Sequence, residues 1–313
     1  MKKRIVIALG GNALGDSLEE QKNSAKITAS AIVDLVEAGH EIAIVHGNGP
    51  QVGMIQTAFE TAAKQSSQFS AMPLPVCVAL SQGYIGNDLQ NSLRTELDKR
   101  GLKNPVATII TQVEVDPSDP AFKNPTKPIG IFMTKEEADV LAGKGISVME
   151  DAGRGWRQVV ASPKPVNIIE VETVKAMMKT GQIPISVGGG GIPVSMKEGQ
   201  YQGMSAVIDK DFSAAKLAQL IDADMLIILT AVEKVAINFN KPDQKLLDSL
   251  SIAEAEKYIA EDHFAKGSML PKVQAAISFV QSGSENKPHT ALITLLTKAK
   301  DGIEGKTGTK IVK

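Results

Sequence analysis

Cysteine, histidine and aromatic residues are scarce in this sequence of 313 residues, and each scarcity excludes a class of function. The single cysteine, Cys77, lies in an apolar run, so no disulfide can form within the chain and a buried, unreactive thiol is predicted. The four histidines do not cluster with other metal-ligating residues, which argues against a zinc site. Aromatic residues make up only 4%, too few to stack the bases of a single-stranded nucleic acid.

An excess of charge and a long apolar segment are absent as well. Lys and Arg total 34 and Asp and Glu total 35, and the resulting net charge of −1 does not support binding to nucleic acid or to a membrane surface. The apolar run after Arg4 ends at Gly10, too short for an export signal, and no segment is long enough to span a bilayer. We therefore expect a cytoplasmic protein, and the chain length predicts two lobes rather than one core.

Glycine-rich segments, in contrast, follow three of the predicted strands. Glycine at the carboxyl end of a strand, just before a helix, leaves backbone N–H groups exposed to a phosphate or a carboxylate. Three such ends predict that several loops converge on one anionic ligand, which favours phosphate chemistry. The three transitions lead from strand 4–9 to Gly10-Gly11-Asn12, from strand 41–45 to His46-Gly47-Asn48-Gly49, and from strand 183–187 to Gly188-Gly189-Gly190-Gly191.

Strands and helices alternate along most of the chain, which predicts an α/β sandwich with a mainly parallel central sheet. Ser17 with Glu20, and Ser251 with Glu254, have the spacing of capping boxes at helix starts. The expected strands are 4–9, 41–45, 106–111, 183–187, 225–229 and 290–296, and the expected helices are 17–38, 50–63, 81–100, 213–221, 251–260 and 271–282.

Residues 116–165 interrupt this alternation. They are rich in proline and contain the single tryptophan, Trp156, together with apolar residues that need burial. We predict a small folded insertion at the rim of the sheet that acts as a lid. Within it, Arg154 and Arg157 are expected to pair with the neighbouring acidic residues and to pin the lid. These acidic residues are Glu150 and Asp151.

Two lysine-bearing segments outside the insertion are candidates for binding phosphate. An apolar triplet leads into Asp209-Lys210-Asp211, where the lysine could neutralise a phosphate and an aspartate could orient lysines or hold Mg²⁺. The same segment could instead be a solvated helix start capped by Ser213. Lys272 follows Pro271 in a first helical turn, where a lysine opposes the helix dipole unless an anion is bound. The residues alone leave both interpretations of the first segment open.

Taken together, these segments resemble the carbamate kinases, a branch of the amino acid kinase family, over essentially the whole chain. The Pro-Thr-Lys-Pro segment of the insertion separates this branch from others that share the fold. The resemblance rests on residues Ala8–Ala13, His46–Gly53, Asn124–Gly130, Glu150–Trp156, Gly188–Pro193, Ala206–Asp211 and Gly267–Lys272.

The resemblance implies an open three-layer α/β/α sandwich with a protruding lid at about 116–165. Residues 1–222 would bind carbamate, the phosphoryl acceptor, and residues 223–313 would bind ATP. ADP and carbamoyl phosphate as products, Mg²⁺ as cofactor and a homodimer are implied as well. The implied catalytic residues are Lys127, Lys210, Asp211 and Lys272; the implied substrate contacts are Gly10, Gly11, Asn12, Gly47, Asn48, Gly49, Gly189 and Gly190; the implied nucleotide contacts are Lys210, Thr230, Ala231, Val232, Val235, Phe239, Met269 and Lys272.

Each residue of the implied catalytic set has its own role. Lys127 would reach down from the lid to the site. Lys210 would replace the lysine that many relatives carry in the first loop, and Lys272 would contact the migrating phosphate. Asp211 would orient both of these lysines. Ser205 departs from the family pattern, because an acidic residue is expected at its position.

The implied reaction needs no catalytic base, because a carbamate oxygen is already anionic near neutral pH. The task is to bring two anions together across a loose transition state, which lysines, Mg²⁺ and backbone N–H groups can do. A closed lid would keep water from the acyl phosphate. The resemblance implies work toward ATP in fermentative breakdown of arginine or purines.

The same fold is compatible with two alternative functions. The first is an acetylglutamate, glutamate or uridylate kinase, against which the lid segment argues. The second is a catalytically silent nucleotide-sensing subunit, against which the complete set Lys210, Asp211 and Lys272 argues.

Overall fold

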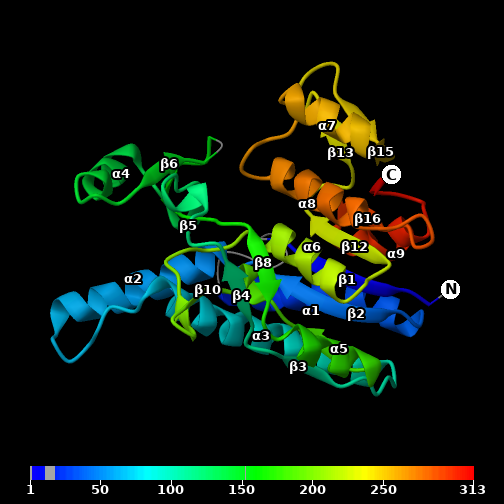
Figure 1. Ribbon diagram of the computed structural model, residues 1–313, viewed down its shortest axis with the longest axis horizontal. Helices are drawn as coiled ribbons and strands as arrows, with labels where there is room; N and C mark the ends of the chain where they lie inside the picture. Colours follow the sequence, from blue (N-terminus) through cyan, green and yellow to red (C-terminus); the bar gives the residue numbers. More distant parts are fainter. Residues whose placement is uncertain (1, 11–17, 152) are drawn as a thin grey trace.

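A computed structural model describes residues 2–10, 18–151 and 153–313, and its centre is one large, mainly parallel sheet (Figure 1). The strand order within the described residues is β15-β17-β16-β12-β1-β2-β9-β3, and six strands from β16 to β3 run parallel. β17 runs antiparallel to β16, and β15 runs parallel to β17. The strands are β1 (Arg4–Leu9), β2 (Glu41–His46), β3 (Val106–Thr108), β9 (Ile183–Ile185), β12 (Met225–Thr230), β15 (Ser249–Ser251), β16 (Thr290–Leu295) and β17 (Thr309–Val312).

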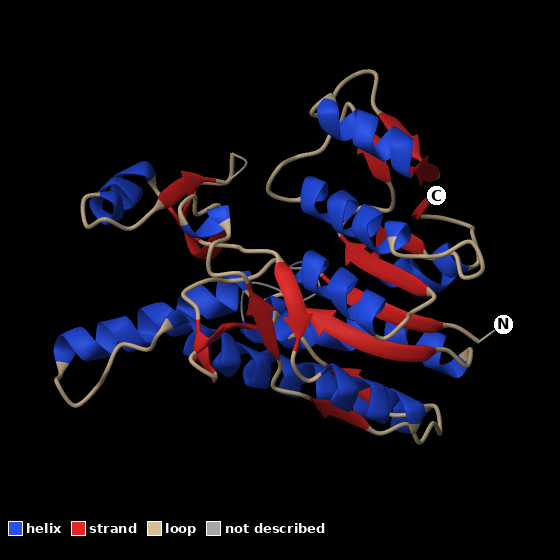
Figure 2. Ribbon diagram, viewed as in Figure 1, coloured by secondary structure: helices blue, strands red, loops and turns tan. Residues whose placement is uncertain are grey.

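Helices cover both faces of this sheet, so the α/β/α sandwich expected from the sequence is confirmed (Figures 1 and 2). One face is covered by α1 (Leu18–Glu37), α3 (Leu74–Lys99) and α9 (Ala299–Ile303). The other face is covered by α5 (Val171–Lys179), α6 (Lys210–Leu220) and α8 (Met269–Gln281).

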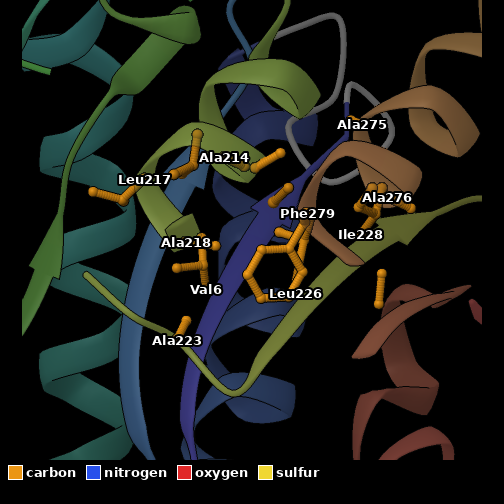
Figure 3. Packing of buried hydrophobic residues seen from close by; sticks show 14 of the residues in the cluster. Val6, Ala214, Leu217, Ala218, Ala223, Leu226, Ile228, Ala275, Ala276 and Phe279 are labelled. Atoms are coloured by element: carbon orange, nitrogen blue, oxygen red, sulfur yellow. The ribbon is translucent and has the colours of Figure 1, made fainter. Parts of the chain in front are cut away.

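The apolar run of β1 is continuous because both of its faces are buried. Side chains alternate across a strand, so Ile5 and Ile7 pack toward α1 and α3, whereas Val6 packs toward α6 and α8. Figure 3 shows this second face, where small residues of α6 and α8 allow Phe279 to lie against the strands. The core is thus two apolar layers that hold the carboxyl ends of β1 and β2 in fixed positions.

A second sheet of four strands carries the lid. Its order is β11-β10-β4-β8, and the lid emerges between β4 and β8, which pair antiparallel. The lid itself is a three-stranded sheet in the order β5-β7-β6 with one helix, α4, and lies apart from the main sheet (Figure 1). The elements are β4 (Gln112–Val115), β5 (Lys127–Met133), α4 (Lys135–Ala142), β6 (Val148–Glu150), β7 (Trp156–Val160), β8 (Pro165–Ile168), β10 (Ile192–Lys197) and β11 (Gln200–Gly203).

A third apolar cluster joins the base of the lid to the second sheet and to two helices. Ile129 and Val160 of the lid pack with Val52 of α2 (Gly49–Gln65) and with Cys77 of α3. The cysteine is fully buried, as predicted. The remaining elements are the hairpin β13 (Val235–Ile237) and β14 (Lys245–Leu247), α7 (Ile252–Ala260), and the short turns η2 (Pro120–Phe122), η3 (Gly188–Gly190) and η4 (Leu296–Lys298).

Most predicted elements are present, and their ends differ for local reasons. The helix expected at 213–221 begins at Lys210, because the Asp209 side chain accepts the Asp211 N–H and caps it; Ser213 is not the cap. The helix expected at 81–100 begins at Leu74, since Pro75 fits a first helical turn. The capping box of Ser251 is confirmed, whereas Ser17 lies outside the described residues.

Three short helices, α4, α5 and α9, escaped the sequence analysis. The strand expected at 106–111 ends at Thr108, after which the Thr111 hydroxyl donates to Ile109 O and accepts from Val187 N, turning the chain out of the sheet. No helix in the described ranges combines the length and the apolar character that crossing a membrane requires.

Candidate functional site

The carboxyl ends of β1 and β2 lie side by side in the sheet, with Leu9 opposite His46. Both strands continue into glycine: Gly10 donates its N–H to Leu229 O at 3.2 Å, and Gly47 donates to Leu9 O at 3.2 Å. These two amides are therefore not bare, which corrects the sequence-based expectation for them. A Cβ at Gly10 would lie 2.9 Å from Leu229 O, so close backbone packing explains the glycine. The predicted substrate contacts Gly11 and Asn12 lie outside the described residues.

The glycine run after β9 packs against the end of β2 and against the segment before α6. A Cβ at Gly189 would lie 2.2 Å from Asn48 Nδ2, and a Cβ at Gly190 would lie 2.2 Å from Ile208 O. Both glycines have positive φ (66° and 88°), which other residues adopt with strain. The Ser213 hydroxyl donates to Gly190 O at 2.7 Å. The third predicted glycine loop thus packs against the second, at the end of β2. Its contact with a substrate remains a prediction.

His46 is a buried residue of this junction, and the sequence analysis named it in the second glycine segment without assigning it a role. Its Nδ1 lies 2.8 Å from Gly47 O, and a Cβ at Gly188 would lie 2.4 Å from its Nε2. Burial lowers the pKa of His46 to about 4, so the ring is neutral at physiological pH. The position at the end of an apolar strand was the available signal for burial.

Two lysines from different helices converge on one aspartate. Lys210 begins α6 and Lys272 lies in the first turn of α8, and their Nζ atoms lie 2.7 Å and 2.9 Å from the two carboxylate oxygens of Asp211. All three residues are buried or nearly so. A Cβ at Gly47 would lie 3.2 Å from Lys210 Cδ, so the lysine stem runs beside the end of β2. The structure therefore brings together Lys210, Asp211, Lys272 and the second glycine loop.

Burial and charge act in opposite directions on these groups. Burial lowers the pKa of Lys210 to about 8, and the attraction of Asp211 only partly offsets it. For Lys272, burial works in the same direction, but Asp211 outweighs it and raises the pKa. Burial works to raise the pKa of Asp211, but Lys210 and Lys272 outweigh it, so the pKa falls below its usual range. The cluster is thus two ammonium groups around one carboxylate, a net positive site suited to an anion.

The lid reaches this cluster through Lys127. Its Nζ lies 2.5 Å from Asp209 Oδ2, immediately before α6. The lid strand also approaches α2 closely, and no room is left for a Cβ at Gly53, which would lie 2.2 Å from Gly130 Cα. The four predicted catalytic residues therefore lie around the start of α6.

The predicted ion pairs of the lid are confirmed for one of its two acidic residues. Arg154 and Arg157 both pair with Asp151, at 3.0 Å and 3.2 Å. Glu150 instead accepts the backbone N–H of Gly153. Arg157 also donates to Gly130 O at 2.8 Å, and this hydrogen bond joins β7 to β5.

The residues predicted to line the adenine pocket differ in their surroundings. Thr230 ends β12 and is half-buried, Ala231 and Phe239 are exposed, and Val232 is half-buried. Val235 is fully buried in the main core, and Met269 packs at the edge of the same core. Nucleotide binding by this set stays a prediction.

The described residues offer no resident metal site. They contain no group of three or more His, Cys, Asp or Glu side chains that could hold a metal ion. Asp209 and Asp211 already pair with lysines. These donors therefore do not fit a protein-bound Mg²⁺.

Comparison with known protein families matches residues 3–287 to the amino acid kinase family. The chain belongs to the amino acid kinase family. Among its relatives in this family, it is 63% identical over 311 residues to the "Carbamate kinase-like protein YqeA" of Escherichia coli K12, covering 99% of each chain. It is 54% identical over 316 residues to "Carbamate kinase" of Clostridium perfringens, covering 99% of this chain and 100% of the relative.

A solved member of the same family has the same fold. The structure "Carbamate kinase from Giardia lamblia bound to AMP-PNP" superposes with a TM-score of 0.88 at 40% identity, covering 100% of this chain and 99% of that one. The amino acid kinase fold that the sequence motifs predicted is thereby confirmed.

Proposed function

We propose that this chain is a carbamate kinase, which transfers a phosphoryl group reversibly between ATP and carbamate to give ADP and carbamoyl phosphate. The observation that carries the proposal is the convergence of Lys210 and Lys272 on Asp211 beside Gly47. Carbamate kinases from other organisms, at 54% and 49% identity over nearly the whole chain, support the choice of acceptor.

The lysine cluster supplies what this transfer needs. In a loose transition state, negative charge spreads over the equatorial oxygens of the transferring group while two anionic reactants repel each other. Two ammonium groups from α6 and α8 offset this repulsion, and Asp211 holds them in place before substrate arrives. Their positions are preorganised, so little reorganisation is required during the reaction. A carbamate oxygen is already anionic, so no residue has to act as a base.

The lid would complete the site on the acceptor side. Lys127 is proposed to contact carbamate or carbamoyl phosphate, and the lid sheet would keep water from the acyl phosphate. Mg²⁺ is proposed to arrive bound to the nucleotide phosphates, where it would offset their charge, since the described carboxylates are occupied by lysines.

Several finer assignments follow from the resemblance alone. We propose that residues 1–222 bind the acceptor and residues 223–313 the nucleotide, and that the enzyme is a cytoplasmic homodimer. A pathway that breaks down arginine or purines by fermentation, running toward ATP, is proposed on the same ground.

The decisive experiment measures ATP formation by the purified protein from ADP and carbamoyl phosphate. The reverse reaction is then tested with carbamate, acetylglutamate, glutamate and uridylate as acceptors, with ADP release as the readout. We expect ATP formation and a clear preference for carbamate. Binding of ATP without turnover, or preference for another acceptor, would overturn the proposal.

A further inference from the structure

The two carboxylate oxygens of Asp209 contact different parts of the fold. Its Oδ1 accepts the backbone N–H of Asp211 at 2.9 Å and caps the start of α6. Its Oδ2 lies 2.5 Å from Lys127 Nζ, on the first residue of the lid strand β5. The two partners are far apart in sequence and are joined only by the fold.

Positive charge surrounds this carboxylate. Burial works to raise the pKa of Asp209, but the charges of Lys127 and Lys210 outweigh it, and Lys272 adds to them, so the pKa lies well below its usual range. Lys164, next to β8, also feels the charge of Asp209. The group is therefore ionised at neutral pH and can hold the lid lysine by charge as well as by hydrogen bonding.

The two contacts of Asp209 fix groups that have to act together. The capped turn of α6 carries Lys210 and Asp211, whose side chains are paired at 2.7 Å. The lid contact fixes Lys127, the residue proposed to meet the acceptor. One side chain thus sets both the start of the helix that bears the phosphate lysine and the position of the lid lysine.

We propose that Asp209 is a positioning residue that registers the lid lysine against the catalytic lysines of α6 and α8. The part that Lys127 plays in the reaction under this proposal rests on the proposed function. Asp209 does not touch the reacting atoms in this scheme; it acts through Lys127 and through the first turn of α6. A cap alone would need only a side-chain oxygen, whereas the registering role needs the negative charge.

Hydrogen exchange on the substrate-free protein tests the lid contact without any reliance on activity. Asp209→Asn keeps an oxygen for the cap and loses the charge, and Asp209→Ser does the same if the first variant fails to fold. The matched control is Asp139→Asn, which removes an exposed Lys–Asp pair with Lys135 on α4 of the lid. We expect exchange in 127–133 to rise by about tenfold or more in the Asp209 variants and to stay at the wild-type rate in the control. Wild-type exchange in an Asp209 variant that folds would overturn the proposal.

A double-mutant cycle with Lys127→Met tests the coupling in catalysis. Asp209→Asn is expected to raise the KM for carbamoyl phosphate by about tenfold, with a smaller fall in kcat. In the Lys127→Met background the same change should add little, because the partner is already gone. Effects that multiply fully in the double variant would show that Asp209 acts elsewhere, and would overturn the proposal. An inactive wild-type enzyme would refute the proposed function instead, and the exchange result would still decide the lid contact.

Discussion

Asp211 is the residue on which the proposed chemistry depends most, because it holds two lysines that would otherwise repel each other. Removing either lysine leaves the carboxylate with one partner and takes one cation from the transferring group. The geometry therefore couples Lys210 and Lys272 through one carboxylate.

Lys210→Ala and Lys272→Ala are each expected to lower kcat by at least about a hundredfold, as loss of one preorganised electrostatic stabiliser does. Steady-state ATP formation measures this, and circular dichroism shows whether the variants fold. A turnover near that of the wild type in either variant would refute the role assigned to that lysine.

The lowered pKa of Lys210 predicts a pH dependence. Because the pKa is about 8, the side chain loses its charge as the pH rises through that value. The kcat/KM for carbamoyl phosphate should therefore fall above pH about 8, since this parameter reports groups of the free enzyme. Lys210→Arg stays protonated, and its residual activity should lack this alkaline limb. An identical limb in the arginine variant would assign the titration to another group.

At the scale of elements, close packing between glycines decides where the lid sits. α2 and β5 meet at Gly53 and Gly130, and the glycine run meets β2 and the segment before α6. A Cβ at Gly53, Gly189 or Gly190 would lie 2.2 Å from an atom of the neighbouring element, so these glycines set the distances between elements.

Gly53→Ala should displace the lid, because the new Cβ would lie 2.2 Å from Gly130 Cα and 2.3 Å from Gly130 N, both backbone atoms. We expect turnover to fall by about tenfold or more as Lys127 moves away from the site. The matched control is Gly83→Ala in α3, where a Cβ meets no atom within 4 Å. Its activity should be unchanged and its Tm equal or higher, since alanine favours the helix. Equal activity of the two variants would contradict the packing argument.

At the scale of the whole molecule, the main sheet runs through both proposed lobes. β1 pairs with β12 along its length on one side and with β2 on the other, so the acceptor side and the nucleotide side share one core. A buried group at the end of these strands therefore affects the unfolding of the whole protein.

Because of His46, we expect the free energy of unfolding of the whole protein to fall in mild acid. Its pKa is about 4 in the folded protein against 6.5 for an ordinary histidine. Between these values the unfolded chain binds the proton and the folded chain does not, so stability is lost as the pH falls from about 6.5 to 4. The loss from this residue is on the order of 3 kcal/mol. Denaturant unfolding at several pH values should show a shallower acid slope in His46→Asn than in the wild type. Equal slopes would place the effect on other groups.

Much of the fold and part of the site could be predicted from the sequence, since they depend on local patterns. Continuous apolar runs required strands buried on both faces, amphipathic segments required helices, and Ser251 with Glu254 marked a helix start. The motif around Lys210 and the position of Lys272 after Pro271 indicated groups for an anion, and the family resemblance linked them to one reaction.

The sequence by itself determined which residue types are available: lysines and aspartates at helix starts, glycines after strands, and one buried cysteine. The family resemblance already implied that Asp211 orients two lysines, whereas only the tertiary structure decided that Asp209 holds Lys127 and that His46 lies against the glycine run. The physical reason is that ion pairs and steric contacts act over a few ångströms in space, whereas local sequence patterns extend over only a few neighbouring residues. The partners of the ion pairs Lys272–Asp211 and Lys127–Asp209 are 61 and 82 residues apart in the sequence.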